Sequence, residues 1–417
     1  MESSALNEEE KKLYWNIRYQ HAGKIEVMRS LYILSEFLSR HYNKNVIILI
    51  DEYDVPMARA TSNGYYKEML EIMKGFMQAL KDNSYLKLAV VTGCLKIAKE
   101  SIFTGTNNFV SNTITSSRLN EYYGFAQSEV DRILEDADIN GKEEIMKKWY
   151  DGYCVDGVSI YNPKSVVEAM LRGKFSNYWT QTETYEALKI YIQSNEFGVQ
   201  DVILKLLAGE KEKIDTTTFS NDMVTFATKD DVLTLLVHLG YLTYNAETKE
   251  IWIPNDEVME QFISTVKVMG WGSVVTALET SEKLLQATLS GDEQTVAELI
   301  EQAHQANASI LKYNDENALS CVISLAYYSA QKNYTLHREM PAGKGFADIV
   351  FEPNRNCNLP ALIVELKWGH SAEEAVEQIK RKDYLDCLQN YHGEVLLVGV
   401  NYDKEKRHTC KIERVMR

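Results

Sequence analysis

Two β-rich runs near the C-terminus constrain the fold of this chain more than any other stretch. Phe346–Pro353 and Pro360–Trp368 are rich in β-branched and aromatic residues, and a polar loop with three asparagines separates them. We expect the runs to pair as a β-hairpin whose midpoint follows Asn356. A regular hairpin then places Asp348 directly opposite Glu365, because both lie equally far from that midpoint.

Directly opposed residues of a hairpin have Cβ atoms about 5 Å apart. Two carboxylates at that separation can share one Mg²⁺ with oxygen distances of roughly 2.1 Å. Lys367 points to the same face as Glu365, since strand side chains repeat every second residue. The pattern therefore predicts a metal site with a cation beside it. An amphipathic strand with its charged face toward solvent gives much the same alternation and stays an alternative. The Gly- and Lys-bearing loop Pro341–Gly345 and two flanking helices favour the metal site.

Length and composition predict a soluble protein of two or three domains. The chain has 417 residues, 45% of them hydrophobic and 25% charged. It has no apolar run long enough for a membrane span, and its acidic, polar N-terminus is unlike a secretory signal peptide. The six cysteines are scattered without a C-x-x-C pair, which indicates reduced thiols. We expect a cytoplasmic protein that does not associate with membranes.

The net charge of −15 opposes a protein that coats nucleic acid. Residues 311–417, however, carry 15 basic and 15 acidic side chains, so the whole excess of acid lies in the first 310 residues. The C-terminal part can therefore approach a phosphate backbone.

The first third of the chain predicts an α/β layer. Residues 7–42 have a helical apolar stripe, and Tyr65–Leu80 predicts a second helix. The apolar runs Val46–Pro56 and Leu86–Gly93 are typical of parallel strands buried on both faces. Asp51 and Glu52, at the end of the first run, resemble the Walker B acids of P-loop NTPases, and Thr92 resembles a sensor position.

A G-x-x-x-x-G-K-[ST] loop, which cradles nucleotide phosphates, is absent. A buried strand ending in acids is the alternative interpretation of Asp51 and Glu52. We expect no ATPase activity from this chain, and ATP as a ligand only if a P-loop is supplied elsewhere. Residues 124–290 are expected to be mostly helical. The helix Asp230–Gly240 and a following hairpin resemble a winged-helix unit, but the hairpin is not basic and we expect it to have a packing role.

The last third has the order helix, hairpin, helix, strand. Tyr313–Ser329 predicts a helix with Glu316 in its first turn. Ser371–Tyr391 predicts the next helix, in which Gln378 shares a face with Lys382, four residues later, and not with Tyr384, six residues later. Glu394–Asn401 then predicts a buried strand, followed by a hairpin partner.

This order resembles the PD-(D/E)XK nuclease superfamily, through PAGKGFADIVF, VELKW, QIKRKDY and LLVGVNYDKEKRH. The resemblance implies that Asp348, Glu365 and Lys367 form the catalytic core. It also implies that Glu316 joins Asp348 and Glu365 around the metal, Mg²⁺ or Mn²⁺, and that Gln378 orients the site. Ala347 stands where the superfamily name has proline.

With LIDEYDVP, TGCLKIAKESIFTGTNN, GYLT and IPNDEV, nearly the whole chain resembles proteins that join an AAA-ATPase-like region to such a nuclease domain. The fold expected is α/β: an incomplete P-loop NTPase-like parallel sheet in residues 1–123, a helical, winged-helix-like middle in 124–290 and a restriction-endonuclease-like domain in 291–417. Since relatives carry a P-loop, we infer a truncated or degenerate NTPase half.

The function expected is metal-dependent hydrolysis of nucleic acid, with DNA as the substrate. One alternative is a non-catalytic regulatory protein whose ATPase-like half senses a nucleotide or a partner, which titration with labelled ATP would reveal. Another is a decayed fragment, which the intact Asp348, Glu365 and Lys367 set argues against. A homo-oligomer is compatible with the sequence.

Overall fold

The computed structural model describes most of the chain. The residues described are 3–94, 110–113, 119–139, 141–155, 157–179, 192, 198–219, 226–269, 271–307, 320, 323–354, 357–389, 391–403 and 407–417. None of the helices in these segments is long and apolar enough to cross a bilayer.

Contacts divide the chain into two compact units whose segments alternate along the sequence. The first unit comprises Met1–Asn140, Asp151–Pro163 and Lys213–Ile251. The second comprises Gly141–Tyr150, Lys164–Glu212 and Trp252–Arg417. The division into three regions at residues 123 and 290 stays a prediction.

The N-terminal part of the first unit is an α/β layer. Strands β1 and β2 pair in parallel, as predicted, with Ile48 opposite Ala89. Ile48 packs into a core with Met57, Met73 and Met77. The elements are α1 (Glu8–Arg18), α2 (Lys24–Tyr42), β1 (Val46–Ile50), α3 (Val55–Ser62), α4 (Tyr66–Met77) and β2 (Leu86–Val91).

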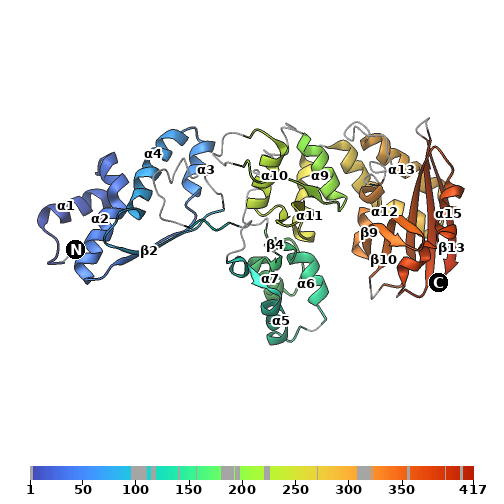
Figure 1. Ribbon diagram of the computed structural model, residues 1–417, viewed down its shortest axis with the longest axis horizontal. Coiled ribbons are helices and arrows are strands. Elements are labelled where there is room, and N and C mark those ends of the chain that lie inside the picture. Colours follow the sequence, from blue (N-terminus) through green and yellow to red (C-terminus); the bar gives the residue numbers. More distant parts are fainter. Residues whose placement is uncertain are drawn as a thin grey trace. The chain divides into compact units, whose positions relative to one another are not determined.

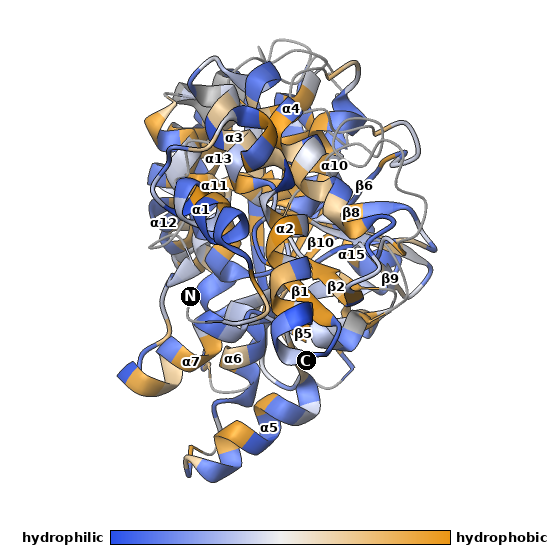
Figure 2. Cartoon of the chain, turned by 90° about the vertical axis from the view of Figure 1, so that its left-hand side faces the viewer, coloured by the Kyte–Doolittle hydropathy of each residue, from blue (hydrophilic) through white to orange (hydrophobic). Residues whose placement is uncertain are grey.

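The prediction that these strands are buried on both faces was wrong. Ile47, Leu49, Leu88 and Val90 alternate with the core positions and are between 44% and 74% exposed. Apolar residues of β1, β2 and α2 appear in orange in Figure 2. An uninterrupted apolar run has apolar residues at the positions of both strand faces. It therefore does not reveal that only one face of the β1–β2 pair is packed against other elements.

Residues 119–252 contain small sheets as well as helices. One three-stranded sheet has the order β3-β5-β4 and another the order β6-β8-β7. The first was missed in the sequence because its strands are only two to four residues long. The elements are β3 (Phe125–Ala126), α5 (Gln127–Asp136), α6 (Glu143–Tyr150), β4 (Tyr153–Val155), β5 (Val158–Tyr161), α7 (Pro163–Arg172), α9 (Val199–Leu207), β6 (Glu212–Lys213), α10 (Lys229–His238), β7 (Thr243–Asn245) and β8 (Glu250–Trp252). The predicted helix and hairpin at 230–253 are thus confirmed as α10, β7 and β8.

A five-stranded mixed sheet dominates the C-terminal part of the second unit. Its order is β13-β12-β11-β10-β9, with β11 parallel to β12 and antiparallel to β10. One helix, α15, packs on one side of the sheet, and α12 and α13 lie on the other (Figure 1). The elements are α11 (Asp256–Val268), α12 (Gly272–Ser290), α13 (Glu293–Asn307), η5 (Tyr328–Lys332), β9 (Tyr334–Ala342), β10 (Gly345–Pro353), β11 (Ala361–Trp368), α15 (Ala372–Arg381), η6 (Tyr384–Leu388), β12 (Glu394–Tyr402) and β13 (His408–Met416).

Two local features differ from the sequence-based prediction. Pro341–Gly345, expected to be a loop, contains the end of β9, the two-residue turn Gly343-Lys344 and the start of β10. The helix predicted over Ser371–Tyr391 ends at Arg381, because the chain turns at Asp383, whose φ is 57°. The segment after this turn, η6, returns along the sheet and packs its Tyr384 into the core.

Helix α15 lies close to the sheet because β12 carries a glycine beneath it. A Cβ added at Gly399 would lie 2.2 Å from the carbonyl oxygen of Ala372 and 3.0 Å from the side chain of Val376. Since the first of these atoms belongs to the backbone, a larger residue would force the helix away from the strand.

We predict that Gly399→Ala lowers the stability of the second unit by about 1–3 kcal/mol, the usual cost of overpacking a core. Thermal unfolding of the variant and the wild type, followed by calorimetry, measures this cost. An unchanged midpoint would contradict the close packing of α15 on β12.

Candidate active site

The register of the β10–β11 hairpin brings the predicted carboxylates together. Ile349 pairs with Val364 and Val350 with Ile363, which confirms the predicted register. Continuing this register by one residue places Asp348 across from Glu365. The half-buried Asp348 accepts a hydrogen bond through Oδ2 from the backbone N–H of Leu366, at 2.7 Å. This bond fixes the Asp348 carboxylate beside β11.

Glu365 is a buried carboxylate at the centre of the sheet. The residue is 1% exposed, and its Oε1 accepts hydrogen bonds from Nζ of Lys367, at 3.3 Å, and from Nε2 of Gln378. Burial, together with the negative charge of Asp348, raises the pKa of Glu365 to about 7. The positive charges of Lys367 and Lys382 act in the opposite direction.

Helix α15 contributes Gln378 to this group, as predicted. Nε2 of Gln378 also donates a hydrogen bond to the hydroxyl of Tyr384, at 3.4 Å. The prediction that Gln378 does not share a face with Tyr384 assumed one continuous helix, and that assumption was wrong, because the chain turns at Asp383. Tyr384 was therefore missed. The helical pattern continues through Lys382 and Asp383, so the sequence gives no signal of the turn that brings Tyr384 to this group.

The second oxygen of Glu365, Oε2, is buried and has no hydrogen-bond partner among the described residues. A buried carboxylate oxygen without a donor is costly unless a cation binds it. Asp348 and Glu365 supply the oxygen ligands that Mg²⁺ or Mn²⁺ prefers, and Mg²⁺ needs only one or two protein carboxylates because it keeps several waters. These two residues therefore fit a divalent ion. Glu316 lies outside the described residues, which contain no cluster of three or more His, Cys, Asp or Glu side chains suited to a metal.

In the first unit the Walker B-like acids Asp51 and Glu52 follow β1, and Thr92 follows β2. Oγ1 of Thr92 donates a hydrogen bond to Oδ1 of Asp51, so these two residues meet. Glu52 is exposed, and its φ of 53° places it in the left-handed region. Together these three residues form a polar end to the parallel pair.

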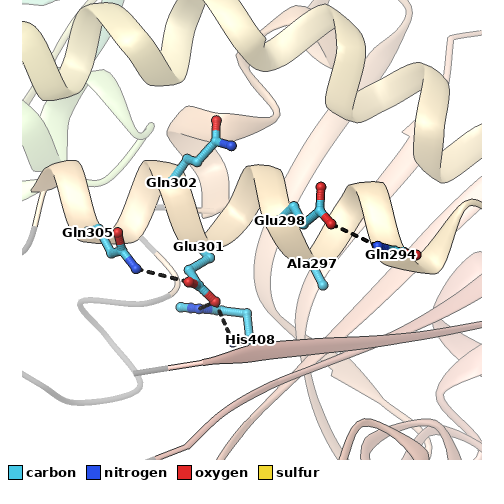
Figure 3. Close-up of a pocket in the computed structure, with 7 residues that line it drawn as sticks. All are labelled: Gln294, Ala297, Glu298, Glu301, Gln302, Gln305 and His408. Carbon is cyan, nitrogen blue, oxygen red and sulfur yellow. Dashed lines mark hydrogen bonds and ion pairs between the residues drawn. The ribbon is translucent and has the colours of Figure 1, made fainter. Parts of the chain in front are cut away.

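A shallow pocket of about 390 Å³ lies between α13 and the start of β13 (Figure 3). Its lining consists of amide and acidic side chains around one histidine: Gln294, Ala297, Glu298, Glu301, Gln302, Gln305 and His408. Nε2 of His408 lies 3.0 Å from Nδ1 of His304, and Nδ1 of His408 lies 3.9 Å from a carboxylate oxygen of Glu301. Burial, and then the neighbouring His304, lower the pKa of His408 to about 3. A neutral, buried histidine thus joins α13 to β13.

Both end regions of the chain match models of known protein families. Residues 314–412 match a family model described as the PD-(D/E)XK nuclease superfamily. The C-terminal part of the chain is a PD-(D/E)XK nuclease superfamily domain. Residues 3–103 match a model described as a predicted AAA-ATPase, so the chain begins with an AAA-ATPase-like region. Both regions of the predicted two-part resemblance are thereby confirmed.

A curated relative is an uncharacterized protein in the vnfD 5′ region of Azotobacter chroococcum mcd 1. It is 27% identical over 143 residues, which cover 34% of this chain and 28% of the relative. This chain thus aligns with less than a third of that relative's length. No solved structure matches the chain.

We predict that protonation of His408 contributes to acid unfolding of the nuclease superfamily domain. The unfolded chain binds this proton near the ordinary pKa of 6.5, and the folded chain only near 3. Stability is therefore lost as the pH falls from about 6.5 to 3, by at most about 1.4 kcal/mol per pH unit. Urea unfolding at several pH values measures the slope.

His408→Gln should reduce this slope, whereas the same change at the exposed His392 should leave it unaltered. Equal slopes in the wild type and the His408 variant would contradict the prediction.

Proposed function

We propose that this protein hydrolyses phosphodiester bonds of nucleic acid, with DNA as the substrate, at a divalent-ion site between Asp348 and Glu365. The observation that carries the proposal is the unpartnered, buried Oε2 of Glu365 beside a second carboxylate. The match of this region to the nuclease superfamily supports the same reaction class.

Each side chain of the site has a role in this proposal. Asp348, held by the Leu366 N–H, and Glu365 would bind Mg²⁺ or Mn²⁺. Such an ion would neutralise charge on the phosphate and lower the pKa of a water molecule. Lys367 places its ammonium next to Glu365, where it can orient the attacking water and offset the negative charge that develops on the phosphate.

Gln378 acts through Glu365. Its amide donates to Oε1 and so leaves Oε2 as the oxygen that is free to bind an ion. Groups that orient a metal ligand in this way tune the affinity of the site for the metal. Glu316, as the resemblance implies, would add a third carboxylate.

The AAA-ATPase-like region has a separate place in the proposal. Asp51 and Glu52 would contact a nucleotide and its Mg²⁺ only together with a P-loop from elsewhere. The nuclease reaction is proposed to proceed without ATP hydrolysis by this chain.

We predict that Asp348→Ala and Lys367→Ala each reduce DNA cleavage more than about a thousandfold. Uncatalysed phosphodiester hydrolysis is so slow that the site must supply well over about 10 kcal/mol. Plasmid nicking and cleavage of labelled single-stranded DNA with Mg²⁺ or Mn²⁺ measure the effect. The control is Glu352→Gln, which removes a carboxylate from the same strand at its bond with His337. Equal activity of all four proteins would exclude this site.

We also predict that Gln378→Leu weakens Mn²⁺ binding and cleavage by about 10–100-fold, because Glu365 loses the donor that orients it. Calorimetric titration with Mn²⁺ reports binding, and raising the Mn²⁺ concentration should restore part of the activity. A variant with the affinity of the wild type would show that the bond to Glu365 has no part in metal binding.

A further inference from the structure

Lys382 lies beside the site although the sequence pattern assigns it no part in the reaction. It is the C-cap of α15, and its backbone N–H donates to the carbonyl oxygen of Gln378, one helical turn earlier. The Lys382 side chain thus projects from the helix face that carries Gln378. Its ammonium lies 5.7 Å from the centre of the Tyr384 ring, and Tyr384 accepts a hydrogen bond from the same Gln378.

The turn between β9 and β10 packs against Lys382. The N–H of Lys344 donates to the carbonyl oxygen of Lys382, at 2.9 Å. Gly343 has a φ of 48°, as the first central residue of a type II′ turn requires. A Cβ at Gly343 would lie 2.1 Å from the carbonyl oxygen of Lys382.

Gly345 leaves room for the lysine side chain. A Cβ at this position would lie 3.3 Å from Cδ of Lys382 and 3.4 Å from its Nζ. Together, the backbone bond and the two glycines hold Lys382 between the turn and the end of α15, on the side where Glu365 lies.

The ammonium groups of Lys382 and Lys380 have different surroundings. Nζ of Lys380 pairs with carboxylates of Glu413, at 2.8 Å, and Glu377, at 3.1 Å. Lys382 is half-buried, and within the described part of the chain no carboxylate forms an ion pair with it. Its charge acts on Glu365 from beyond ion-pair distance. A held ammonium that no ion pair neutralises is suited to bind a phosphate.

We propose that Lys382 binds a phosphate of the nucleic-acid backbone next to the phosphate that is cleaved, and so positions the strand over Asp348 and Glu365. This inference rests on the proposed nuclease function, for which Lys367 serves the reacting phosphate. Lys382 is then a substrate-binding residue, and its loss should weaken binding more than the chemical step.

The salt dependence of DNA binding tests this directly. Fluorescence anisotropy with a labelled duplex oligonucleotide gives the dissociation constant between 50 and 300 mM KCl, in an Asp348→Asn background that does not cleave. Each phosphate contact contributes about 0.9 to the slope of log Kd against log salt on duplex DNA. We expect Lys382→Gln to lower that slope by about this amount and Lys382→Arg to restore it. Lys380→Gln, on the same helix, should leave the slope unchanged.

Steady-state cleavage with Asp348 intact supplies the second measurement. We expect Lys382→Gln to raise KM roughly tenfold, the loss of one charged hydrogen bond, with kcat largely retained. If the wild type cleaves DNA and Lys382→Gln keeps its slope and KM, only the role of Lys382 is overturned. If the wild type neither binds nor cleaves DNA, both this inference and the proposed function fail.

Discussion

The register between β10 and β11 is the constraint on which the C-terminal site depends. Side chains of a strand alternate between its faces, so a slip of one residue would turn Asp348 away from Glu365. The buried pair Val350 and Ile363, two residues from these carboxylates, packs in the core beneath α15 and opposes such a slip. Apolar packing thereby fixes the distance between two acidic groups that repel each other.

That packing also creates the chemical character of the site. Exclusion of water from Glu365 makes the charged form of this carboxylate costly. Lys367 and Gln378 both donate to Oε1 and so offset only part of that cost, because Oε2 has no partner among the described residues. Helix α15 delivers Gln378 because Gly399 lets it approach β12 closely. The same helix ends at a reversal that brings Lys382 and Tyr384 back beside Gln378. One sheet face, the short helix α15 and the turn that follows it thus contribute these site residues.

Much of this arrangement could be predicted from the sequence, because local patterns encode it. Alternation and the polar loop were enough for the hairpin register, and the spacing from Glu365 placed Lys367 on its face. The reversal at Asp383 could not be predicted, since a left-handed residue within a helical pattern leaves no periodic signal. The exposed face of β1 was also missed, because Ile47 and Leu49 are as apolar as Ile48. Whether a strand face is buried depends on which other elements pack against it, and the apolar pattern does not contain that information.

Crystals of the wild-type protein soaked in Mn²⁺ test the central claim most directly, because anomalous diffraction locates the ion without reference to activity. We predict an anomalous peak between the carboxylates of Asp348 and Glu365, within coordination distance of both. Mn²⁺ bound elsewhere, with the Glu365 carboxylate still unliganded in a protein that cleaves DNA, would contradict a catalytic role for this pair.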